Sequence, residues 1–519
     1  MKPKNLFEYT DVTQSQKLKT QVCIIGSGCG GATIAKKLTD RGLDVIILEQ
    51  GGYYPATSMD QNELNMSGKL SAERNFSTNH DSGTVLLSGN NVGGASVHYW
   101  ADSYRTPDWK LKRWAEKYGI EGHTKEDLAA AWDELEKNLN IHPATDEYMN
   151  KMNLLLKDAS KKLDWHGHRV PQARKYCQKS GHCMQGCLYD AKQSQMVTHI
   201  PQALAQGGRL YADAQAETLT WENGKASSLK VNMINRATNK PNGITLTIEA
   251  EKFVVAAGGF NSSFFLLKQG LKKQLPALGK YFSMNPSTMV HALYDENITL
   301  WRNIPASYGI DEFLQHRPSN GKYIEGGYML MANQVQPALL AASMPGYGSE
   351  HSDFMKNMSN IGGTISWIDD IEDELGEIRI TDKGNKEVLY EYGPKTQAVL
   401  KDSIIKQAQL LFTSGAKKVV IAGHQGITLN SLSELHKVES LVIEAGGLFL
   451  ASPHPGGGCR MGKDPKNSVV NSDHLVHGFD NLYVSDSSVF PTSSALDPSL
   501  TLMAFSYIAA EKIIESFKS

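Results

Sequence analysis

Three of the six cysteines of the chain lie close together in the segment CQKSGHCMQGC, which runs from Cys177 to Cys187 with Cys183 between them. The spacing is C-x5-C-x3-C. Ferredoxin-type segments bind a four-iron cluster through C-x2-C-x2-C-x3-C, and this chain keeps the first, third and fourth of those positions, with Ser180 at the second. Three thiolates without the second ligand suit a cluster that lacks one iron. The spacing therefore predicts a 3Fe-4S cluster with Cys177, Cys183 and Cys187 as its metal ligands.

Three other interpretations of the cysteine segment stay open. Zinc needs a fourth ligand, and His182 is available, although its position next to Cys183 strains the geometry. A disulfide between Cys183 and Cys187 requires a helical stretch, in which residues i and i+4 are neighbours. Cytoplasmic redox conditions oppose such a bond. The simplest alternative is a set of free thiols in a tight turn.

A second group of residues has the spacing of a dinucleotide site. Gly26, Gly28 and Gly31 form G-x-G-x-x-G, and Glu49 follows at the end of the next apolar run. Such glycines allow a tight turn and a close approach of backbone N–H groups to a pyrophosphate at a helix N-terminus. Glu49 would accept hydrogen bonds from the ribose hydroxyls of the adenosine. The motif predicts a dinucleotide cofactor but does not distinguish FAD from NAD.

The elements around the glycines support this interpretation. Residues 20–25 form a short apolar run that predicts a buried strand, a helical pattern follows the glycines, and residues 43–50 predict a second strand. This is a βαβ unit. Further along, the pattern predicts strands between 209 and 258 and a helix that starts near 395 and stops at Gly415.

Composition limits the class of protein. The chain has 519 residues, 40% of them hydrophobic, with a formal net charge of −2, so no overall basic charge is present to attract nucleic acid. No apolar stretch approaches the length of a membrane span. The N-terminal lysines lack the apolar run of a secretory signal. We expect a cytoplasmic protein, or a periplasmic one only if it is exported with a partner that carries the signal.

Four further segments, together with the glycine motif and in this order, carry a resemblance to a known family. They are GNNVGGASVHYW (89–100), VVAAGGFNSS (254–263), HPGGGCRMG (454–462) and NLYVSDSSVFPTSSALDPSLTLMA (481–504). The chain resembles the glucose–methanol–choline (GMC) oxidoreductases, which use FAD to oxidise alcohols. The motifs span nearly the whole chain.

The resemblance implies an α/β (α+β) fold in which a Rossmann-like FAD-binding domain is assembled from separate segments. A substrate domain with an antiparallel sheet and helices accompanies it. We expect FAD-binding parts at 1–105, 209–265 and 446–519, the last with the catalytic loop. Substrate-side helices and the cysteine-rich insert would occupy 106–208, and the substrate domain 266–445.

The same resemblance assigns residues to the cofactor. Gly93, Gly94 and Ser96 bring backbone close to the flavin, and His98 is a flavin neighbour, with covalent attachment as an open alternative. Asp486 corresponds to the acidic residue of the family near the FAD ribityl and pyrophosphate. A helix that starts at Asp497–Pro498 would point its N-terminus toward the flavin pyrimidine.

His454 matches the active-site histidine of the family, and histidine is a residue type suited to the removal of a hydroxyl proton near neutral pH. The family usually has histidine or asparagine where this chain has Asp497. An ionised aspartate can only accept hydrogen bonds, so this difference bears on the chemistry. Asp497 is predicted either to take part in catalysis or to cap the helix, and both roles can coexist.

We therefore predict an FAD-dependent alcohol dehydrogenase that passes electrons through a 3Fe-4S cluster to an electron-transfer partner or small subunit. Two alternatives remain: an alcohol oxidase that uses oxygen and has structural cysteines, or a flavin-binding electron-transfer subunit without turnover. The substrate is a sugar or polyol, or a long-chain or steroid alcohol. The cysteine spacing resembles the sugar dehydrogenases, whereas residues 355–424 resemble the long-chain alcohol oxidases.

Overall fold

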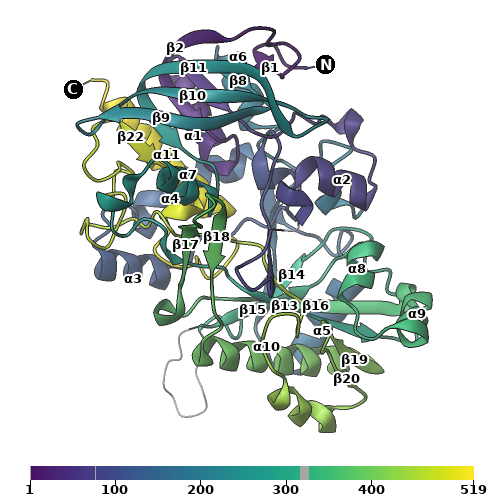
Figure 1. Cartoon of the computed structure of the whole chain (residues 1–519). Helices are drawn as coiled ribbons and strands as arrows, with labels where there is room; N and C mark the ends of the chain where they lie inside the picture. The colour runs from purple at the N-terminus through teal and green to yellow at the C-terminus, as the bar shows by residue number, and fades with distance from the viewer. Residues whose placement is uncertain (1, 76, 316–325, 519) are drawn as a thin grey trace.

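The structure of the chain, a computed structural model, describes residues 2–75, 77–315 and 326–518. Two large sheets lie one above the other in Figure 1, and the chain passes between them several times. The upper sheet contains the N-terminal strands and the lower sheet contains most strands from the second half of the chain. The mixed α/β architecture predicted from the sequence is confirmed.

The upper sheet is mixed, and its strand order in the described residues is β1-β8-β3-β2-β11-β10-β9, with β22 also paired to β11. The strands from β1 to β11, and β22 beside β11, run parallel, whereas β10 is antiparallel to both of its neighbours. Their bounds are β1 Leu6–Phe7, β2 Gln16–Ile25, β3 Val45–Leu48, β8 Arg209–Tyr211, β9 Ala214–Glu222, β10 Lys225–Asn235, β11 Lys240–Val255 and β22 Leu482–Val484.

The predicted N-terminal βαβ unit is present. Strand β2 is buried from Val22 to Ile25, where it lies between β3 and β11, and all four residues of β3 are buried. Helix α1 (Cys29–Asp40) starts directly after the glycine turn, with Gly28 as its N-cap. Strands buried on both faces need continuous apolar runs, which is the pattern seen in residues 22–25 and 45–48.

The lower sheet is largely antiparallel, with the order β20-β19-β13-β16-β15-β14-β6, and β21 joins β13 to β4. Its strands are β4 Thr84–Leu86, β6 Gly167–Arg169, β13 Ser287–Leu293, β14 Tyr308–Ile310, β15 Tyr328–Ala332, β16 Ile361–Ile368, β19 Lys418–Ile421, β20 Thr428–Leu429 and β21 Leu450–Ser452. Strands β4 and β21 lie in this sheet although their residues fall in segments that the sequence assigned to the FAD-binding domain. The division into domains stays a prediction.

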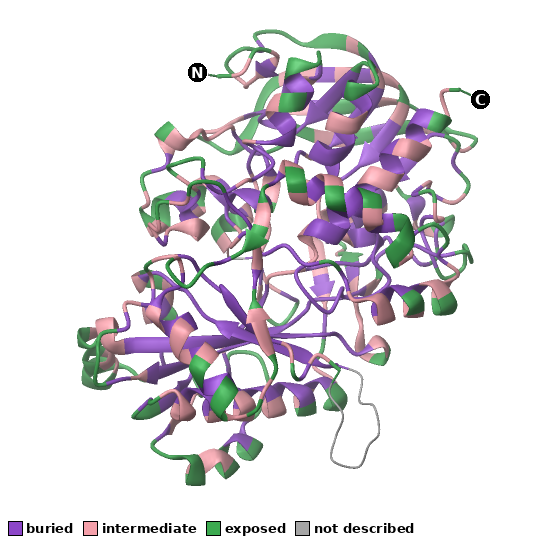
Figure 2. Ribbon diagram, turned by 180° about the vertical axis from the view of Figure 1, so that it is seen from behind, coloured by how far each residue is buried: buried purple, intermediate pink, exposed green. Residues whose placement is uncertain are grey.

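Helix α10 (Pro394–Thr413) packs against β13, β16 and β19. Figure 2 shows the strands of the lower sheet buried along their length, with the exposed face of the helix turned outward. The helix ends at Thr413, and Gly415 follows with φ +105, in agreement with the predicted glycine stop.

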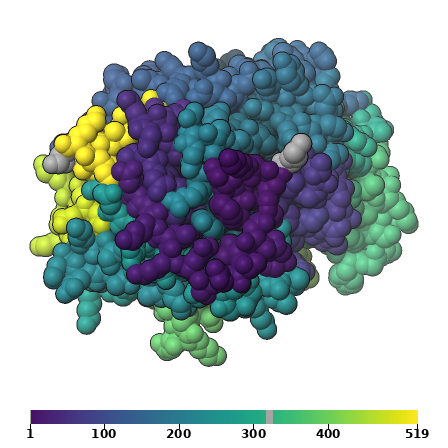
Figure 3. Space-filling view, turned by 90° about the horizontal axis from the view of Figure 1, so that it is seen from above, coloured from purple at the N-terminus to yellow at the C-terminus, as the bar shows by residue number. Residues whose placement is uncertain are grey.

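The remaining helices connect or cover the sheets. They are α2 Glu63–Leu70, α3 Asp108–Tyr118, α4 Lys125–Asn138, α5 Lys151–Lys162, α6 His199–Ala205, α7 Asn261–Lys268, α8 Pro337–Ser343, α9 Gly348–Lys356 and α11 Ser499–Glu515. Helices α6 and α11 pack against α1. Seen from above in Figure 3, the N-terminal residues, the middle of the chain and the C-terminal residues lie side by side. No helix in the described part of the chain is long and apolar enough to cross a membrane.

Candidate active site

The glycine turn between β2 and α1 leaves no room for side chains on its protein-facing side. A Cβ on Gly26, which has φ +107, would lie 2.1 Å from the carbonyl oxygen of Ala256, and one on Gly31 would lie 2.0 Å from the carbonyl oxygen of Gly26. Gly28 faces open space apart from the Cα of Gly94. The turn therefore presents backbone N–H groups at the N-terminus of α1 to a free volume, as a pyrophosphate requires.

Glu49 and Ser27 tie this turn to the second glycine loop. The carboxylate of Glu49 accepts hydrogen bonds from the backbone N–H (3.1 Å) and hydroxyl (2.6 Å) of Ser27 and from the N–H of Gly51 (2.9 Å). Ser27 Oγ in turn accepts from the N–H of Gly93 at 3.0 Å. Burial raises the pKa of Glu49, and its bonds to Ser27 oppose that shift. Glu49 thus helps to shape the two glycine loops, 26–31 and 93–94, which together are called the cradle below. This is in addition to its predicted role toward the ribose.

The second glycine loop approaches the first through its backbone. Gly93 (φ +98) and Gly94 (φ +59) are both left-handed, and a Cβ on Gly94 would lie 2.8 Å from the Cα of Gly28. Ser96 donates from its hydroxyl to the carbonyl of Gly93 at 2.6 Å. Ser96 therefore holds the loop in shape and has its hydroxyl directed into the protein.

His98 is buried, and its Nε2 has no hydrogen-bond partner among the described residues. Burial lowers the pKa of His98 to about 4, and the nearby Lys192 acts in the same direction. The side chain is therefore neutral at pH 7. A buried ring nitrogen without a partner indicates that a group outside the protein completes its environment.

Asp486 lies two residues after β22, at the same edge of the upper sheet as the glycine turn. Its carboxylate accepts hydrogen bonds from the N–H of Gly258 (2.8 Å), the hydroxyl of Ser262 (2.5 Å) and the N–H of Ser488 (2.8 Å). These bonds join the segments 254–263 and 481–504, which the sequence singled out separately. Asp486 fixes how the two meet.

His454 is held at both ring nitrogens. Nδ1 lies 2.7 Å from Asn285 Oδ1, and Nε2 lies 3.1 Å from Asp497 Oδ1. The amide nitrogen of Asn285 donates to the carbonyl of Ile368 at 2.7 Å, which leaves Oδ1 to accept a hydrogen from His454 Nδ1. In the neutral ring, Nε2 then carries the lone pair, so a base at this nitrogen faces Asp497.

Asp497 is not the helix cap that the sequence allowed. Helix α11 begins at Ser499 with Pro498 as the N-cap, and no side chain caps it. The Asp497 carboxylate points to His454 instead, and its Oδ2 has no partner among the described residues. At 3.1 Å the carboxylate oxygen and the ring nitrogen can form a hydrogen bond when one of them carries a proton.

A second buried carboxyl group, Asp102, accompanies Asp497. Ser499, which starts α11, donates to the backbone carbonyl of Asp102 at 3.0 Å. Asp102 Oδ1 accepts from Gln172 Nε2 at 2.5 Å, and Oδ2 is without a partner in the described structure. Burial raises the pKa of Asp102 well above its usual value, and the charge of Asp497 adds to the shift. Burial and the negative charge of Asp497 thus both disfavour ionisation of Asp102.

Aromatic side chains line the neighbourhood of His454. Trp367, on β16, makes an edge contact with the imidazole at 5.1 Å between ring centroids, and Trp100 lies 6.4 Å from Trp367. Their rings restrict the approach of water and give the candidate substrate region an apolar wall.

The residues present fit FAD. The glycine cradle faces open space, and unpartnered buried polar atoms of His98, Asp102 and Asp497 lie along the segments that the cofactor would follow. These observations agree with the sequence expectation for Gly26, Gly28, Gly31, Glu49, Gly93, Gly94, Ser96, His98, Asp486 and Pro498, whose individual roles toward FAD stay predictions.

The cysteine segment is a separate cluster of sulfur and cationic side chains. All six cysteines of the chain are free, so the disulfide alternative is wrong. Arg174 Nη1 donates to Cys183 Sγ, and the N–H of Lys192 donates to Cys187 Sγ, each at 3.4 Å. Both residues are buried, and the Lys192 donor to Cys187 is its backbone N–H, whereas its ammonium group donates to the carbonyl oxygens of Tyr99 and Cys183.

The charges of this cluster influence one another. Burial raises the pKa of the Cys183 thiol, but Arg174 and Lys192 outweigh that effect and lower it below its ordinary value. Burial lowers the pKa of Lys192 to about 8, with Cys183 and Cys187 acting in the opposite direction. The environment favours the thiolate of Cys183, which is the form that binds metal.

The described residues do not support the zinc alternative. Groups of His, Cys, Asp and Glu whose ligand atoms lie within 4.8 Å of one another include neither the three cysteines nor His182. A single metal ion requires such convergence.

A cavity of about 80 Å³ lies beside Cys177, and Tyr176, Arg174 and Gln172 also line it.

Hydrogen bonds connect the cysteine cluster to the carboxyl pair. Arg174 Nε donates to Gln172 Oε1 at 3.0 Å, and Gln172 Nε2 donates to Asp102. Arg174 Nη2 also donates to the carbonyl oxygen of Trp100. The two sites predicted separately from the sequence are thus neighbours linked by two side chains.

Several residues of the site gave no signal in the sequence. Asn285, Asp102 and Gln172 belong to no motif, and the resemblance of residues 355–424 did not single out Trp367; their roles follow only from tertiary contacts. Ser27 is the exception, because its place inside the glycine motif marked the turn in which it lies.

Comparisons with known proteins agree with this arrangement. Profiles of the N- and C-terminal parts of the GMC oxidoreductases match residues 20–287 and 381–506. An uncharacterised GMC-type oxidoreductase of Mycobacterium tuberculosis is 27% identical and is aligned over 96% of this chain and 76% of its own length. A long-chain-alcohol oxidase of Arabidopsis thaliana is 23% identical over 97% of this chain and 69% of its own.

The fold also matches solved structures. A variant of the Aspergillus oryzae formate oxidase superposes with a TM-score of 0.72 at 14% identity and covers 98% of this chain and 100% of its own. At 14% identity, this similarity shows the fold alone.

Proposed function

The chain belongs to the GMC oxidoreductase family, FAD-dependent enzymes that act on CH–OH donors, and on this premise we propose that it is an alcohol dehydrogenase with His454 as its base. The observation that carries the proposal is the environment of His454. Nδ1 of His454 is held by Asn285, and Nε2 faces the carboxyl group of Asp497. Asp102 is a second buried carboxyl group near Asp497.

The protein residues divide the work as follows. Asn285 holds the hydrogen on Nδ1, so the Nε2 lone pair of His454 is available to the hydroxyl proton of an alcohol. The hydroxyl competes with Asp497 for Nε2 when it binds. FAD, when bound, supplies the acceptor for the hydride from the alcohol carbon. Gly26, Gly28 and Gly93 are among the residues that would hold it.

The proton then has a short path away from the imidazole. Asp497 Oδ1 lies 3.1 Å from Nε2, and burial and the charge of Asp497 raise the pKa of the neighbouring Asp102. We propose that the two carboxyl groups carry one proton between them in the resting enzyme. One proton on the two carboxyl groups leaves a single negative charge, so the two groups are not both ionised beside the cofactor.

The test is anaerobic reduction of the bound FAD by an alcohol in wild-type protein and in His454→Asn. We expect bleaching near 450 nm with wild type, and a rate on the order of 10²- to 10⁴-fold lower in the variant, with the same FAD content. His436→Ala, which changes an exposed histidine, is the matched control. Equal rates in His454→Asn would remove the base from the proposal, and no bleaching by any alcohol in wild type would favour a flavin-binding subunit without turnover.

We further propose that Cys177, Cys183 and Cys187 bind a 3Fe-4S cluster that takes electrons onward to a partner. Free thiols, a lowered pKa of Cys183 and unfilled space beside Cys177 support it. Three thiolates and an oxidised cluster core carry a net charge of about −2, which Arg174 and Lys192 would offset. Tyr176 and Tyr189 are exposed beside the segment, so a partner has access to it.

Iron analysis of anaerobically purified protein tests the cluster independently of activity. We expect about three irons per chain, broad absorption beyond the flavin bands, and loss of both in Cys183→Ser. Cys459→Ser, at a buried cysteine far from the segment in sequence, is the control. Iron-free yellow protein with full activity would contradict the cluster and leave the cysteines as structural thiols.

The second candidate is an oxidase that passes electrons to oxygen, and the long-chain-alcohol oxidase relative favours it. Reoxidation by air distinguishes the two, because rapid reoxidation of reduced protein favours the oxidase. The substrate class follows from the same assay with a long-chain alcohol, a steroid, a sugar and a polyol. The apolar wall of Trp367 and Trp100 supports an alcohol whose carbon skeleton is flat or apolar at the reacting end.

A further inference from the structure

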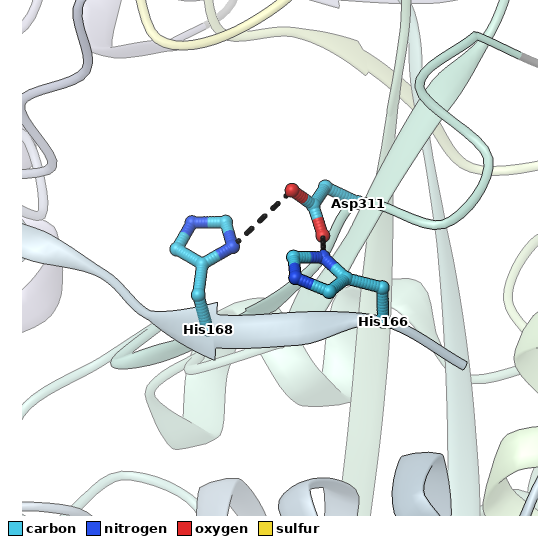
Figure 4. A group of neighbouring side chains, drawn as sticks. All are labelled: His166, His168 and Asp311. Carbon is cyan, nitrogen blue, oxygen red and sulfur yellow. Dashed lines mark hydrogen bonds and ion pairs between the residues drawn. The ribbon is translucent and has the colours of Figure 1, made fainter. Parts of the chain in front are cut away.

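Two histidines and an aspartate converge on one edge of the lower sheet, away from the residues of the proposed reaction. His166 Nδ1 lies 2.5 Å from Asp311 Oδ1, and His168 Nδ1 lies 3.5 Å from Asp311 Oδ2. Figure 4 shows both imidazole rings on the same side of β6, with the carboxylate of Asp311 reaching between them from the neighbouring strand. One ligand atom from each residue lies within 4.8 Å of the other two.

The backbone makes this convergence a consequence of register. Residues i and i+2 of a strand point to the same face, which places His166 and His168 together. Strands β6 and β14 are antiparallel with Gly167 opposite Ile310, so Asp311 comes opposite His166. Gly309 lies opposite His168, and its lack of a side chain leaves room for Tyr104, whose hydroxyl would be 3.0 Å from a Cβ there.

Tyr104 supplies the contact that orients one ligand. Its buried hydroxyl lies 3.1 Å from His168 Nε2, and the two rings meet edge to face at 5.6 Å. A hydrogen on Nε2 that is donated to Tyr104 leaves the lone pair on Nδ1, the nitrogen that faces Asp311. Metal-binding histidines are commonly fixed in this way through their second nitrogen.

We propose that His166, His168 and Asp311 bind a divalent first-row cation, with Zn²⁺ as the best match. Two imidazole nitrogens and one carboxylate oxygen are a frequent zinc donor set, and water would complete a tetrahedral site. The site is empty in this structure. The proposal is independent of the flavin chemistry and of the cysteine cluster.

A bound ion would join two parts of the chain. Strand β6 leads within a few residues to Gln172 and Arg174, whereas β14 belongs to the sheet that carries Trp367. The cation would fasten the edge strand to that sheet through side chains in addition to the short backbone ladder of β6 and β14. Its role is therefore structural, and it should raise the melting temperature without taking part in turnover.

A further acidic residue lies beside the site. Glu312 accepts a hydrogen bond from the N–H of His166 at 2.9 Å and adds negative charge there.

The test is calorimetric titration of chelator-treated, FAD-loaded protein with zinc chloride at pH 7.5. We expect saturable binding of about one Zn²⁺ per chain to this site, with affinity at least about 10-fold weaker in His168→Ala and in Asp311→Asn, and about 10-fold weaker in Tyr104→Phe. His436→Ala should bind as wild type does. Circular dichroism and FAD content confirm that each variant is folded.

Two results would overturn the proposal. One is the absence of saturable binding in wild-type protein, which would leave the three side chains as an ion-pair cluster. The other is equal zinc affinity in wild type, His168→Ala and Asp311→Asn, since zinc held by the cysteines would not respond to these changes. A rise in melting temperature with zinc that disappears in His168→Ala supports the structural role.

Discussion

The cradle, on the nucleotide side of the active site, is formed by backbone, whereas the catalytic side around His454 is formed by side chains. The cradle is made of backbone, because Gly26, Gly31 and Gly94 leave no space for a Cβ where the chain passes itself. The catalytic side is made of side chains, since His454 depends on Asn285 and Asp497 for its position and protons. At a site formed by backbone, any added side-chain atom should disturb the structure. At a site formed by side chains, a replacement of equal size should keep the structure but alter the chemistry.

The largest effect is expected from adding bulk to the cradle. In Gly31→Val, the new Cβ would lie 2.0 Å from the carbonyl of Gly26, so the turn must open and FAD should be lost completely. Absorbance at 450 nm after gel filtration measures this. Gly68→Ala, in helix α2, where a Cβ would meet only Arg74 Nε at 3.8 Å, should keep its FAD, and retention of FAD by Gly31→Val would contradict the backbone account.

A change of chemistry without change of size should spare the cofactor. Asp497→Asn keeps the shape of the side chain but cannot exchange a proton with His454 Nε2. We expect the rate of anaerobic FAD reduction to fall about 100-fold, with the FAD content unchanged. A variant that reduces at the wild-type rate would show that Asp497 only fills space.

Removal of the orienting residue should have a smaller effect. Asn285 has φ +46, which glycine adopts without strain, so Asn285→Gly removes the hydrogen bond to His454 Nδ1 and leaves the backbone in place. Loss of the hydrogen bond that orients His454 should raise the activation free energy by about 1.4 kcal/mol, which lowers the rate about 10-fold. The pH profile should shift as well, because the tautomer is no longer fixed, and an unchanged profile would contradict the role of Asn285.

The smallest effect concerns stability. The folded protein favours protonated Asp102, because burial and Asp497 raise its pKa. Above the pKa of the unfolded chain, the folded state therefore loses stability as pH rises. Asp102→Asn keeps an oxygen for Gln172 and removes the carboxylate, so its free energy of unfolding should exceed that of wild type by about 1 kcal/mol at pH 8 and by less at pH 4. Urea unfolding at the two pH values measures this, and a difference that grows toward low pH would contradict it.

The contrast between the two sides also explains what the sequence could predict. The cradle was visible because its function depends on glycines at fixed local spacing between a strand and a helix, and the structure contains that βαβ unit. Asn285 and Trp367 were not visible, because they meet His454 only after β13 and β16 have paired with Ser287 opposite Trp367. The capping role of Asp497 was wrong because local spacing favoured a helix start, whereas tertiary contact with His454 directs the carboxylate elsewhere.

The order of the strands in the upper sheet has a consequence for biosynthesis. Strand β11 lies between β2, near the start of the chain, and β22, near its end. A Cβ on Gly30 would lie 2.1 Å from the carbonyl of Ser485, so the first helix of the cradle rests on residues translated last. At ribosomal rates of 5–20 residues per second, the first strand waits on the order of a minute for its neighbours. FAD can therefore bind only late in translation. Until then, the apolar residues 22–25 have to be shielded from water by something other than their neighbours in the sheet.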